Sequence, residues 1–469
     1  MPNPTSFAIA PASWRQELGA TLRLALPLAG TNLLQMAIYS VDVIFIARLG
    51  SQALAVSSLS VSLTGLLMWA MSGLVAGASA IMAAELGRHR HAVREVRRTF
   101  RMGIWLAVLS GSLCMAICAV GEDIMLWTGQ HPIVSSMAGD FLLVLMWTIV
   151  PLVLSSHLRN TISALGRPAI STIIAAFAVA VNALGNYALI YGHFGFPPLG
   201  LQGSAVASVI TSFAMLGAYV IVIAVDRRLR RFRLWGRWWR GEWSRLRQML
   251  LLGVPIAATI LAEAGLFSAA AFLIGRIGAE QLAGHTIALQ LAAITFQVPF
   301  GIAQAATIRV GMAYGAGDRL WAARAGKVSI ALGIGFMALM ALMIWGFPRS
   351  IIRLYVDPDT PANALMVGFA IQYLAIAAAF QLFDGAQAVA AGALRGLQDT
   401  RVPMFIAVFS YWVPGFGLAV ALGFYTPLQG FGIWIGLAAG LVIAATLLLW
   451  RWSQRERLGL VRQPGAAIG

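Results

Sequence analysis

Three carboxylates lie inside long apolar stretches of the sequence: Asp42, Glu263 and Asp384. If these stretches cross a membrane, an ionised carboxylate near the centre of a helix costs about 2.5–3.5 kcal/mol on the insertion scale. That cost predicts that each carboxylate faces a cavity or a polar partner. In such a place it can bind Na⁺ through its oxygens or take up a proton.

Polar neighbours accompany two of these carboxylates at helical spacing. Gln381 and Gln387 lie three residues before and after Asp384, and Thr259 lies four residues before Glu263. Residues three or four apart share one face of a helix. Each carboxylate is therefore predicted to belong to a polar stripe.

Three other apolar stretches carry polar residues at similar spacing. They are Asn32, Gln35, Tyr39 and Asp42 in the first, Asn182 and Asn186 in the second, and Gln290, Gln297 and Gln304 in the third. Two interpretations stay open, because such amides either line a cavity or hydrogen-bond to neighbouring helices. The candidates for a polar cavity lining are Tyr39, Gln290, Gln297, Gln381 and Gln387.

The elements that must position these residues are membrane-spanning helices. The chain of 469 residues is 59% hydrophobic and 11% charged, whereas a soluble protein carries about 25% charged residues. Apolar stretches of the length needed to cross the hydrocarbon core recur along it. We predict twelve spans, at about 22–46, 53–84, 100–120, 138–157, 168–191, 202–225, 249–274, 283–308, 328–347, 364–392, 402–422 and 430–450.

The basic residues support this arrangement and its orientation. With both termini in the cytosol, the segments on the outer side hold only Arg48, Arg276, Arg349 and Arg353 of the 33 lysines and arginines. This asymmetry is the one expected for cytosolic loops. It also explains the net charge of +16 without a nucleic-acid partner, and it assigns the basic, tryptophan-rich stretch at 226–248 to an inner-face linker on anionic lipid. No basic residue lies deep in a predicted span, so we expect no ion pair to neutralise the buried carboxylates.

The two halves of the chain resemble each other. "ALPLAG" at 25–30 matches "GVPIAA" at 253–258, and "ARLGSQALA" at 47–55 matches "GRIGAEQLA" at 275–283, with the same spacing between the copies. We therefore predict two pseudo-symmetric six-helix lobes, 22–225 and 249–450, with cytosolic tails at 1–21 and 451–469. Parallel repeats of this kind are typical of transporters, with the substrate path between the lobes.

The absence of two sequence motifs limits the possible sources of energy for transport. The sequence has no GxxxxGK[ST] loop, which disfavours ATP hydrolysis, and no HExxH motif. An ion gradient is the source that remains. An intramembrane enzyme would need a nucleophile–base pair or a metal cluster, and no motif indicates one.

Four segments carry a resemblance to a known family. "VDVIFIARLG" (41–50), "ATIRVGMAYGAGD" (306–318), "GALRGLQDTRVPM" (392–404) and "SYWVPGFGLAV" (410–420) are similar in order and spacing to the multidrug and toxic compound extrusion (MATE) family. The glutamate and aspartate of the second half resemble its NorM-type bacterial branch. The resemblance covers about residues 20–450.

The resemblance implies roles for particular residues. Glu263 and Asp384 correspond to a coupling-cation site, which would hold a Na⁺ ion if coupling is to sodium. Asp42 and Asn182, with Gln35 and Asn186 beside them, correspond to a polar site for substrate or proton in the first lobe. Asn186 departs from members with a second aspartate there, and this shifts the expected coupling to the second lobe. Phe296 and Phe380 stand near places where some relatives have a tyrosine hydroxyl, so the ion's ligand set is expected to be thinner here.

Together these features predict an all-α membrane protein of a bacterial inner membrane that is not an enzyme, and the resemblance implies that it is a monomer. It would need no cofactor and would export organic cationic drugs in exchange for Na⁺ or H⁺. The alternative is a transporter of the same architecture that flips a lipid-linked or other anionic substrate. That alternative predicts basic residues lining the cavity.

Overall fold

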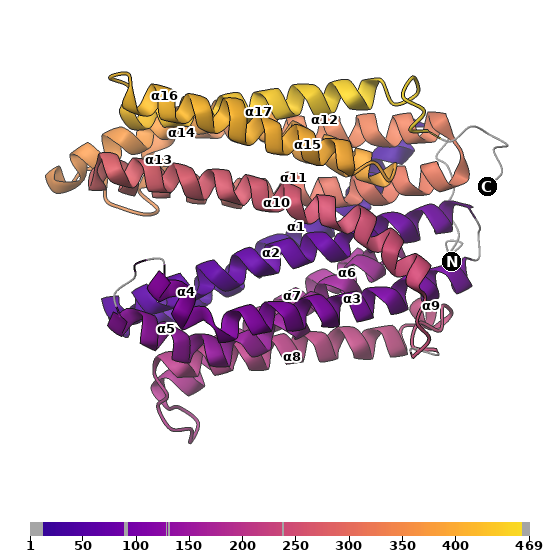
Figure 1. Ribbon diagram of the computed structural model, residues 1–469, viewed down its shortest axis with the longest axis horizontal. Helices are drawn as coiled ribbons and strands as arrows, with labels where there is room; N and C mark the ends of the chain where they lie inside the picture. The colour runs from indigo at the N-terminus through magenta and orange to yellow at the C-terminus, as the bar shows by residue number, and fades with distance from the viewer. Residues whose placement is uncertain (1–12, 89–91, 128, 130–131, 237–238, 462–469) are drawn as a thin grey trace. The chain divides into compact units, whose positions relative to one another are not determined.

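The computed structural model describes residues 13–88, 92–127, 129, 132–236 and 239–461. This part of the chain is helical, without a β-strand (Figure 1). It has twelve helical segments long and apolar enough to cross a membrane. The predicted fold class and number of spans are therefore confirmed.

The chain forms two compact units, which we call the N-unit, Gly30–Ala257, and the C-unit, Met1–Ala29 with Ala258–Gly469. The N-unit contains the second part of α1 (Trp14–Ala47), α2 (Ser51–Arg88), α3 (Val93–Ala119), α4 (Gly121–Trp127), α5 (Pro132–Leu145), η2 (Met146–Thr148), α6 (Ile149–Ala164), α7 (Pro168–Tyr191), α8 (Leu201–Val225), α9 (Arg227–Arg230) and the first part of α10 (Trp243–Ile277). One of its core clusters includes Phe100, Ile162 and Tyr219.

The C-unit contains the first part of α1 and the rest of α10. It continues with α11 (Ala279–Ala316), α12 (Arg319–Gly346), α13 (Pro348–Ile352), η3 (Pro361–Asn363), α14 (Ala364–Gly396), α15 (Arg401–Ser410), η4 (Tyr411–Gly415), α16 (Phe416–Phe424) and α17 (Gln429–Ser453). Its core cluster includes Leu266, Phe380 and Trp434. These units have other bounds than the predicted lobes 22–225 and 249–450, which stay a prediction.

Helices α11 and α14 pack closely because glycine lies at their contact. A Cβ added at Gly392 would lie 2.4 Å from the carbonyl oxygen of Ala303, so only a residue without a side chain fits. Small residues allow two membrane helices to approach in this way. The contact fixes the backbone of α14, on which Asp384 and Gln387 stand.

A wide turn interrupts the helical segment Arg401–Phe424. The turn, η4, is π-helical over Tyr411–Gly415 and contains Pro414. Proline lacks an N–H donor and clashes with the preceding turn of an α-helix, and a π-helical turn accommodates such an interruption. The turn rotates the side chains around it relative to a regular helix, and Tyr411 begins it.

Helix α1 begins at Trp14, earlier than the predicted span at 22. Its first turns belong to the C-unit, where the carboxylate of Glu17 accepts hydrogen bonds from Arg309 at 2.7 and 2.8 Å and from the indole of Trp321 at 3.1 Å. Both charged side chains are at most 1% exposed. The end of the segment predicted as a cytosolic tail, residues 14–21, therefore belongs to α1. The buried side chain of Arg309 neutralises the charge of Glu17 there.

Candidate functional site

The C-unit brings two of the three predicted carboxylates to one amide. The side-chain nitrogen of Gln387 donates to Oδ1 of Asp384 at 3.1 Å and to Oε1 of Glu263 at 3.3 Å. The hydroxyl of Tyr411 donates to the carbonyl oxygen of the same glutamine. We call Glu263, Asp384, Gln387 and Tyr411 the carboxylate cluster.

Three helical segments build this cluster. Glu263 stands on α10, Asp384 and Gln387 stand on α14, and Tyr411 opens the wide turn η4. Asp384, Gln387 and Tyr411 are buried, and Glu263 is partly exposed. In the part of the chain that the structure describes, no arginine or lysine forms an ion pair with either carboxylate.

The N-unit holds the third carboxylate differently. Oδ1 of Asp42 accepts from the side-chain amides of Asn182 at 3.0 Å and Asn186 at 2.7 Å, and Oδ2 accepts from the hydroxyl of Ser208 at 3.3 Å. Both asparagines are fully buried. Three neutral donors from α7 and α8 thus satisfy the carboxylate on α1, and we call these four residues the asparagine cluster.

Gln35 has a different hydrogen-bond partner from Asp42, and its expected place in one site with Asp42 stays a prediction. Its carbonyl oxygen accepts from Nη1 of Arg159 at 2.8 Å, and the same Nη1 lies 3.3 Å from Oδ1 of Asn32. Arg159 is 5% exposed and stands on α6, just beyond the predicted span 138–157. The polar face of α1 is therefore divided between an arginine and the asparagine cluster.

The described helices also contain a buried ion pair that the sequence did not predict. The segments that are apolar and long enough to span a membrane include Glu17 and Arg309, which pair at 2.7 Å. The helices extend beyond the apolar stretches, so basic residues just outside a predicted span are buried near helix ends. The pair does not involve Asp42, Glu263 or Asp384.

The remaining cavity candidates have separate environments. The side-chain nitrogen of Gln381 donates to the hydroxyl of Thr295 at 2.8 Å, and that of Gln297 donates to the carbonyl of Ala293 at 3.1 Å. Gln290 is exposed, and Tyr39 is 43% exposed. These residues stay predictions as a cavity lining.

The two phenylalanines also have separate roles in packing. Phe296 stacks on Phe300 with ring centroids 5.9 Å apart, and Phe380 is buried against Trp434. Neither side chain offers an oxygen ligand.

Sequence reasoning missed Tyr411, Ser208, Thr295 and Arg159 as partners of the predicted residues. Tyr411 lies in the segment 410–420, which resembles the family, but helical spacing does not predict the direction of its side chain across a π-helical turn. Ser208 and Thr295 lie in apolar helices where a hydroxyl commonly bonds its own backbone. In contrast, the charge of Arg159 next to a predicted span was a signal that could have been used.

The sequence matches the profile of the MatE family over residues 27–188 and 255–421. The chain belongs to this family, that of the multidrug and toxic compound extrusion (MATE) transporters. Among curated relatives, the "Probable multidrug resistance protein NorM" of Mesorhizobium japonicum is 45% identical over 445 residues, which are 95% of each chain. The protein of the same name from Brucella suis is 42% identical over 97% of this chain and 96% of that one.

Solved structures share the fold. The eukaryotic MATE transporter AtDTX14 superposes with a TM-score of 0.84 at 17% sequence identity, covering 95% of this chain and 99% of that one. A crystal structure of a MATE protein in the straight conformation gives a TM-score of 0.85 at 18% identity, covering 94% and 97%. The twelve-helix architecture is thus that of the MATE transporters.

Proposed function

We propose that this protein is a cation-coupled antiporter that exports organic cationic drugs from the cytoplasm by alternating access. The coupling cation is Na⁺ or H⁺, and the membrane is a bacterial inner membrane with both chain termini in the cytosol. The names of the NorM relatives support multidrug export. The proposal of cation coupling rests on the geometry of the carboxylate cluster.

The cluster suits a small cation because its charges lack a basic partner among the described residues. Glu263 and Asp384 lie within 3.3 Å of the same nitrogen of Gln387. Two ionised carboxylates so close repel each other in a medium of low dielectric constant. A proton or a Na⁺ ion relieves that repulsion, and oxygen atoms are the ligands that hard cations take.

Exchange follows from competition for this charge. When the cluster is empty, its negative charge attracts an organic cation from the cytosol. When Na⁺ or H⁺ binds from outside, the charge is neutralised and the drug is released. Trp412 is 39% exposed and stands next to Tyr411 in the chain, so its ring is a candidate for a cation–π contact with the drug.

Proteoliposomes test this proposal. We expect an imposed Na⁺ or pH gradient to drive movement of a fluorescent cation, and each gradient applied alone identifies the ion. Removal of one charge by Asp384→Asn or Glu263→Gln removes about 1.5–3 kcal/mol of cation binding, which is a loss of about tenfold or more in coupled transport. The matched control is Glu280→Gln, an exposed carboxylate of the same unit.

Normal transport by both cluster variants would overturn the coupling assignment. The alternative, export of a lipid-linked or other anionic substrate, is tested in the same vesicles with an anionic fluorescent amphiphile. Movement of the anion but not of the cation would replace the proposal with that alternative.

A further inference from the structure

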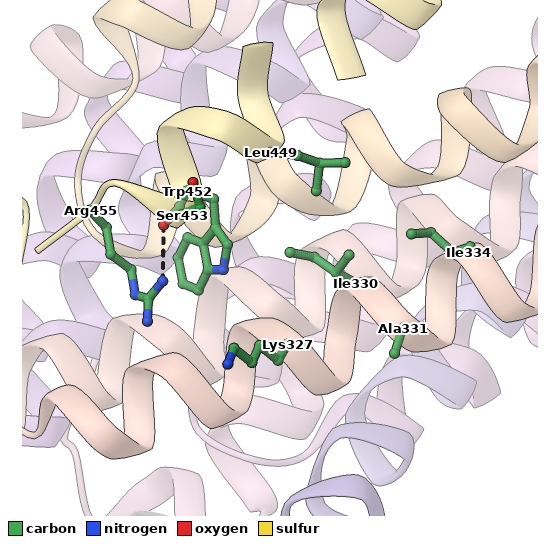
Figure 2. A pocket seen from close by; sticks show the side chains of 8 residues that line it. All are labelled: Lys327, Ile330, Ala331, Ile334, Leu449, Trp452, Ser453 and Arg455. Atoms are coloured by element: carbon green, nitrogen blue, oxygen red, sulfur yellow. Dashed lines mark hydrogen bonds between the residues drawn. The ribbon is translucent and has the colours of Figure 1, made fainter. Parts of the chain in front are cut away.

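A groove in the C-unit lies between α12 and α17 and shares no lining residue with the carboxylate cluster. It has a volume of about 550 Å³, and its lining includes Lys327, Ile330, Ile334, Leu449, Trp452 and Arg455 (Figure 2). The lining residues of α12 follow the spacing of a single helix face, and those of α17 do the same. The groove therefore runs along two neighbouring helices.

The two ends of the groove differ in chemistry. The basic side chains of Lys327 and Arg455 lie together at one end, and Ile330, Ile334 and Leu449 extend along the other (Figure 2). From Lys327 to Ile334 the helix rises about 10 Å. Since α12 and α17 have the length and composition of membrane spans, the groove changes from charged to apolar along the direction that crosses the bilayer.

The charged end has donors without protein partners. Arg455 is 7% exposed, its Nη1 donates to the carbonyl of Trp452 at 3.0 Å, and its guanidinium lies 4.8 Å from the centre of that ring. Its Nε and the indole nitrogen of Trp452 are buried, and within the described residues neither has a hydrogen-bond acceptor. Burying an N–H without an acceptor is costly, so this end of the groove favours a ligand with oxygen acceptors.

The charge at this end is incompletely balanced. Glu456, which pairs with Arg455, lies 3.6 Å away and is 55% exposed. Burial lowers the pKa of Arg455, and the nearby charge of Glu456 opposes this only in part. The side chain of Lys327 is exposed and forms no hydrogen bond or ion pair with the described residues. The end is therefore complementary to an anion.

The floor of the groove depends on a glycine. A Cβ added at Gly326 would lie 1.9 Å from the ring of Trp452. The absence of a side chain at this position lets the indole lie against α12, where its nitrogen stands between the basic end and the apolar end.

We propose that this groove binds an anionic phospholipid of the inner leaflet. The phosphate is held by Lys327, Arg455 and the indole N–H of Trp452, and one acyl chain lies along Ile330 and Ile334. The basic end repels an organic cation, and a free inorganic anion leaves the apolar part of the groove unfilled. The inner leaflet follows from the predicted orientation, which places residues 327 and 451–469 on the cytosolic side.

Native mass spectrometry of the full-length protein in detergent tests the site. We expect dioleoyl phosphatidylglycerol to be retained in preference to dioleoyl phosphatidylcholine. Each basic residue near a membrane surface contributes about 1 kcal/mol toward an anionic lipid, so Lys327→Gln should lower the affinity about fivefold. The double variant Lys327→Gln/Arg455→Gln should lower it about 25-fold. The control double variant Arg227→Gln/Arg230→Gln removes two exposed basic residues of α9 in the N-unit and should retain the lipid.

A second variant separates a lipid from a free phosphate. Ala331 also lines the groove, and Ala331→Trp fills its apolar part without changing a charge. This variant should lower phosphatidylglycerol retention as strongly as Lys327→Gln does. Equal retention of phosphatidylglycerol by the wild type and the Lys327→Gln variant would overturn the proposal. Lys327 is exposed, so its substitution is not expected to impair folding. Competition by millimolar inorganic phosphate, with no effect of Ala331→Trp, would show an anion site alone and would also overturn it.

Discussion

At the scale of single residues, the side-chain amide of Gln387 holds the two carboxylates of the C-unit close together by hydrogen bonds. Gln387 donates to both acids with one nitrogen, and Tyr411 donates to its oxygen, which fixes the direction of the amide. A tyrosine hydroxyl from a later helical segment therefore orients a donor toward two charges that pair with no basic residue of the described chain. Asp42 shows the contrast, since three neutral donors satisfy its oxygens.

The substitution Tyr411→Phe tests this orientation. It removes one hydrogen bond, worth about 0.5–1.5 kcal/mol, while the buried ring keeps its packing. We expect the apparent affinity for the coupling ion to fall about two- to tenfold, with the thermal stability little changed. The dependence of transport rate on ion concentration measures this. Tyr425→Phe is the control, because that ring is 85% exposed; an equal effect of both substitutions would contradict the assigned role of Tyr411.

At the scale of helices, a buried ion pair joins the start of α1 to α11 within the C-unit. Glu17 and Arg309 are at most 1% exposed and pair at 2.7 Å, and Trp321 donates to the same carboxylate. Removing one partner of a buried pair leaves an unbalanced charge and costs about 3–5 kcal/mol. The pair explains why α1 extends beyond its apolar stretch.

We therefore expect Arg309→Met to lower the thermal unfolding temperature markedly, and Glu17→Leu/Arg309→Met to recover most of the loss. Differential scanning fluorimetry in detergent measures both. For comparison, Arg353→Met breaks a pair whose side chains are 64% and 63% exposed, and such pairs contribute at most about 1 kcal/mol. A double variant as unstable as Arg309→Met would contradict this account of α1.

The contact of α11 with α14 gives another prediction at this scale. Gly392→Ala places a methyl group 2.4 Å from the Ala303 carbonyl and should lower the unfolding temperature, because two backbones must separate. Gly368→Ala, on the same helix, meets no atom within 4 Å. Alanine is up to about 1 kcal/mol better than glycine in a helix interior, so this control should be neutral or stabilising. Equal destabilisation by both would show that helix packing is not the cause.

At the scale of the whole molecule, composition and repeats predict the architecture, whereas they do not predict most of the side-chain contacts. The twelve spans follow from apolar length, and the resemblance of the two halves follows from copies of the same short segments. Asp384 with Gln387 is predictable too, because both lie on one helix and helical spacing sets their common face. Glu263 joins them only through tertiary packing, which spacing within one helix cannot give.

The unpredicted contacts have particular physical causes. Tyr411 reaches Gln387 from a π-helical turn, and the period of a regular helix does not describe that turn. Arg159 and Arg309 are buried because their helices extend past the apolar stretches that define a span. The split of α1 between the two units occurs within a continuous helix after residue 29, two residues beyond Pro27, where the sequence shows no break in hydropathy.

We propose that a single cluster, Glu263 with Asp384, couples the export of a drug to the entry of a cation. The most direct measurement loads proteoliposomes with an organic cation and follows ²²Na⁺ uptake and internal pH, with no ion gradient imposed. We predict that drug leaving the vesicles drives one of the two ions inward, and that Asp384→Asn abolishes this movement while Glu280→Gln does not. Drug efflux without any ion uptake, or ion uptake by Asp384→Asn at the wild-type rate, would contradict the claim.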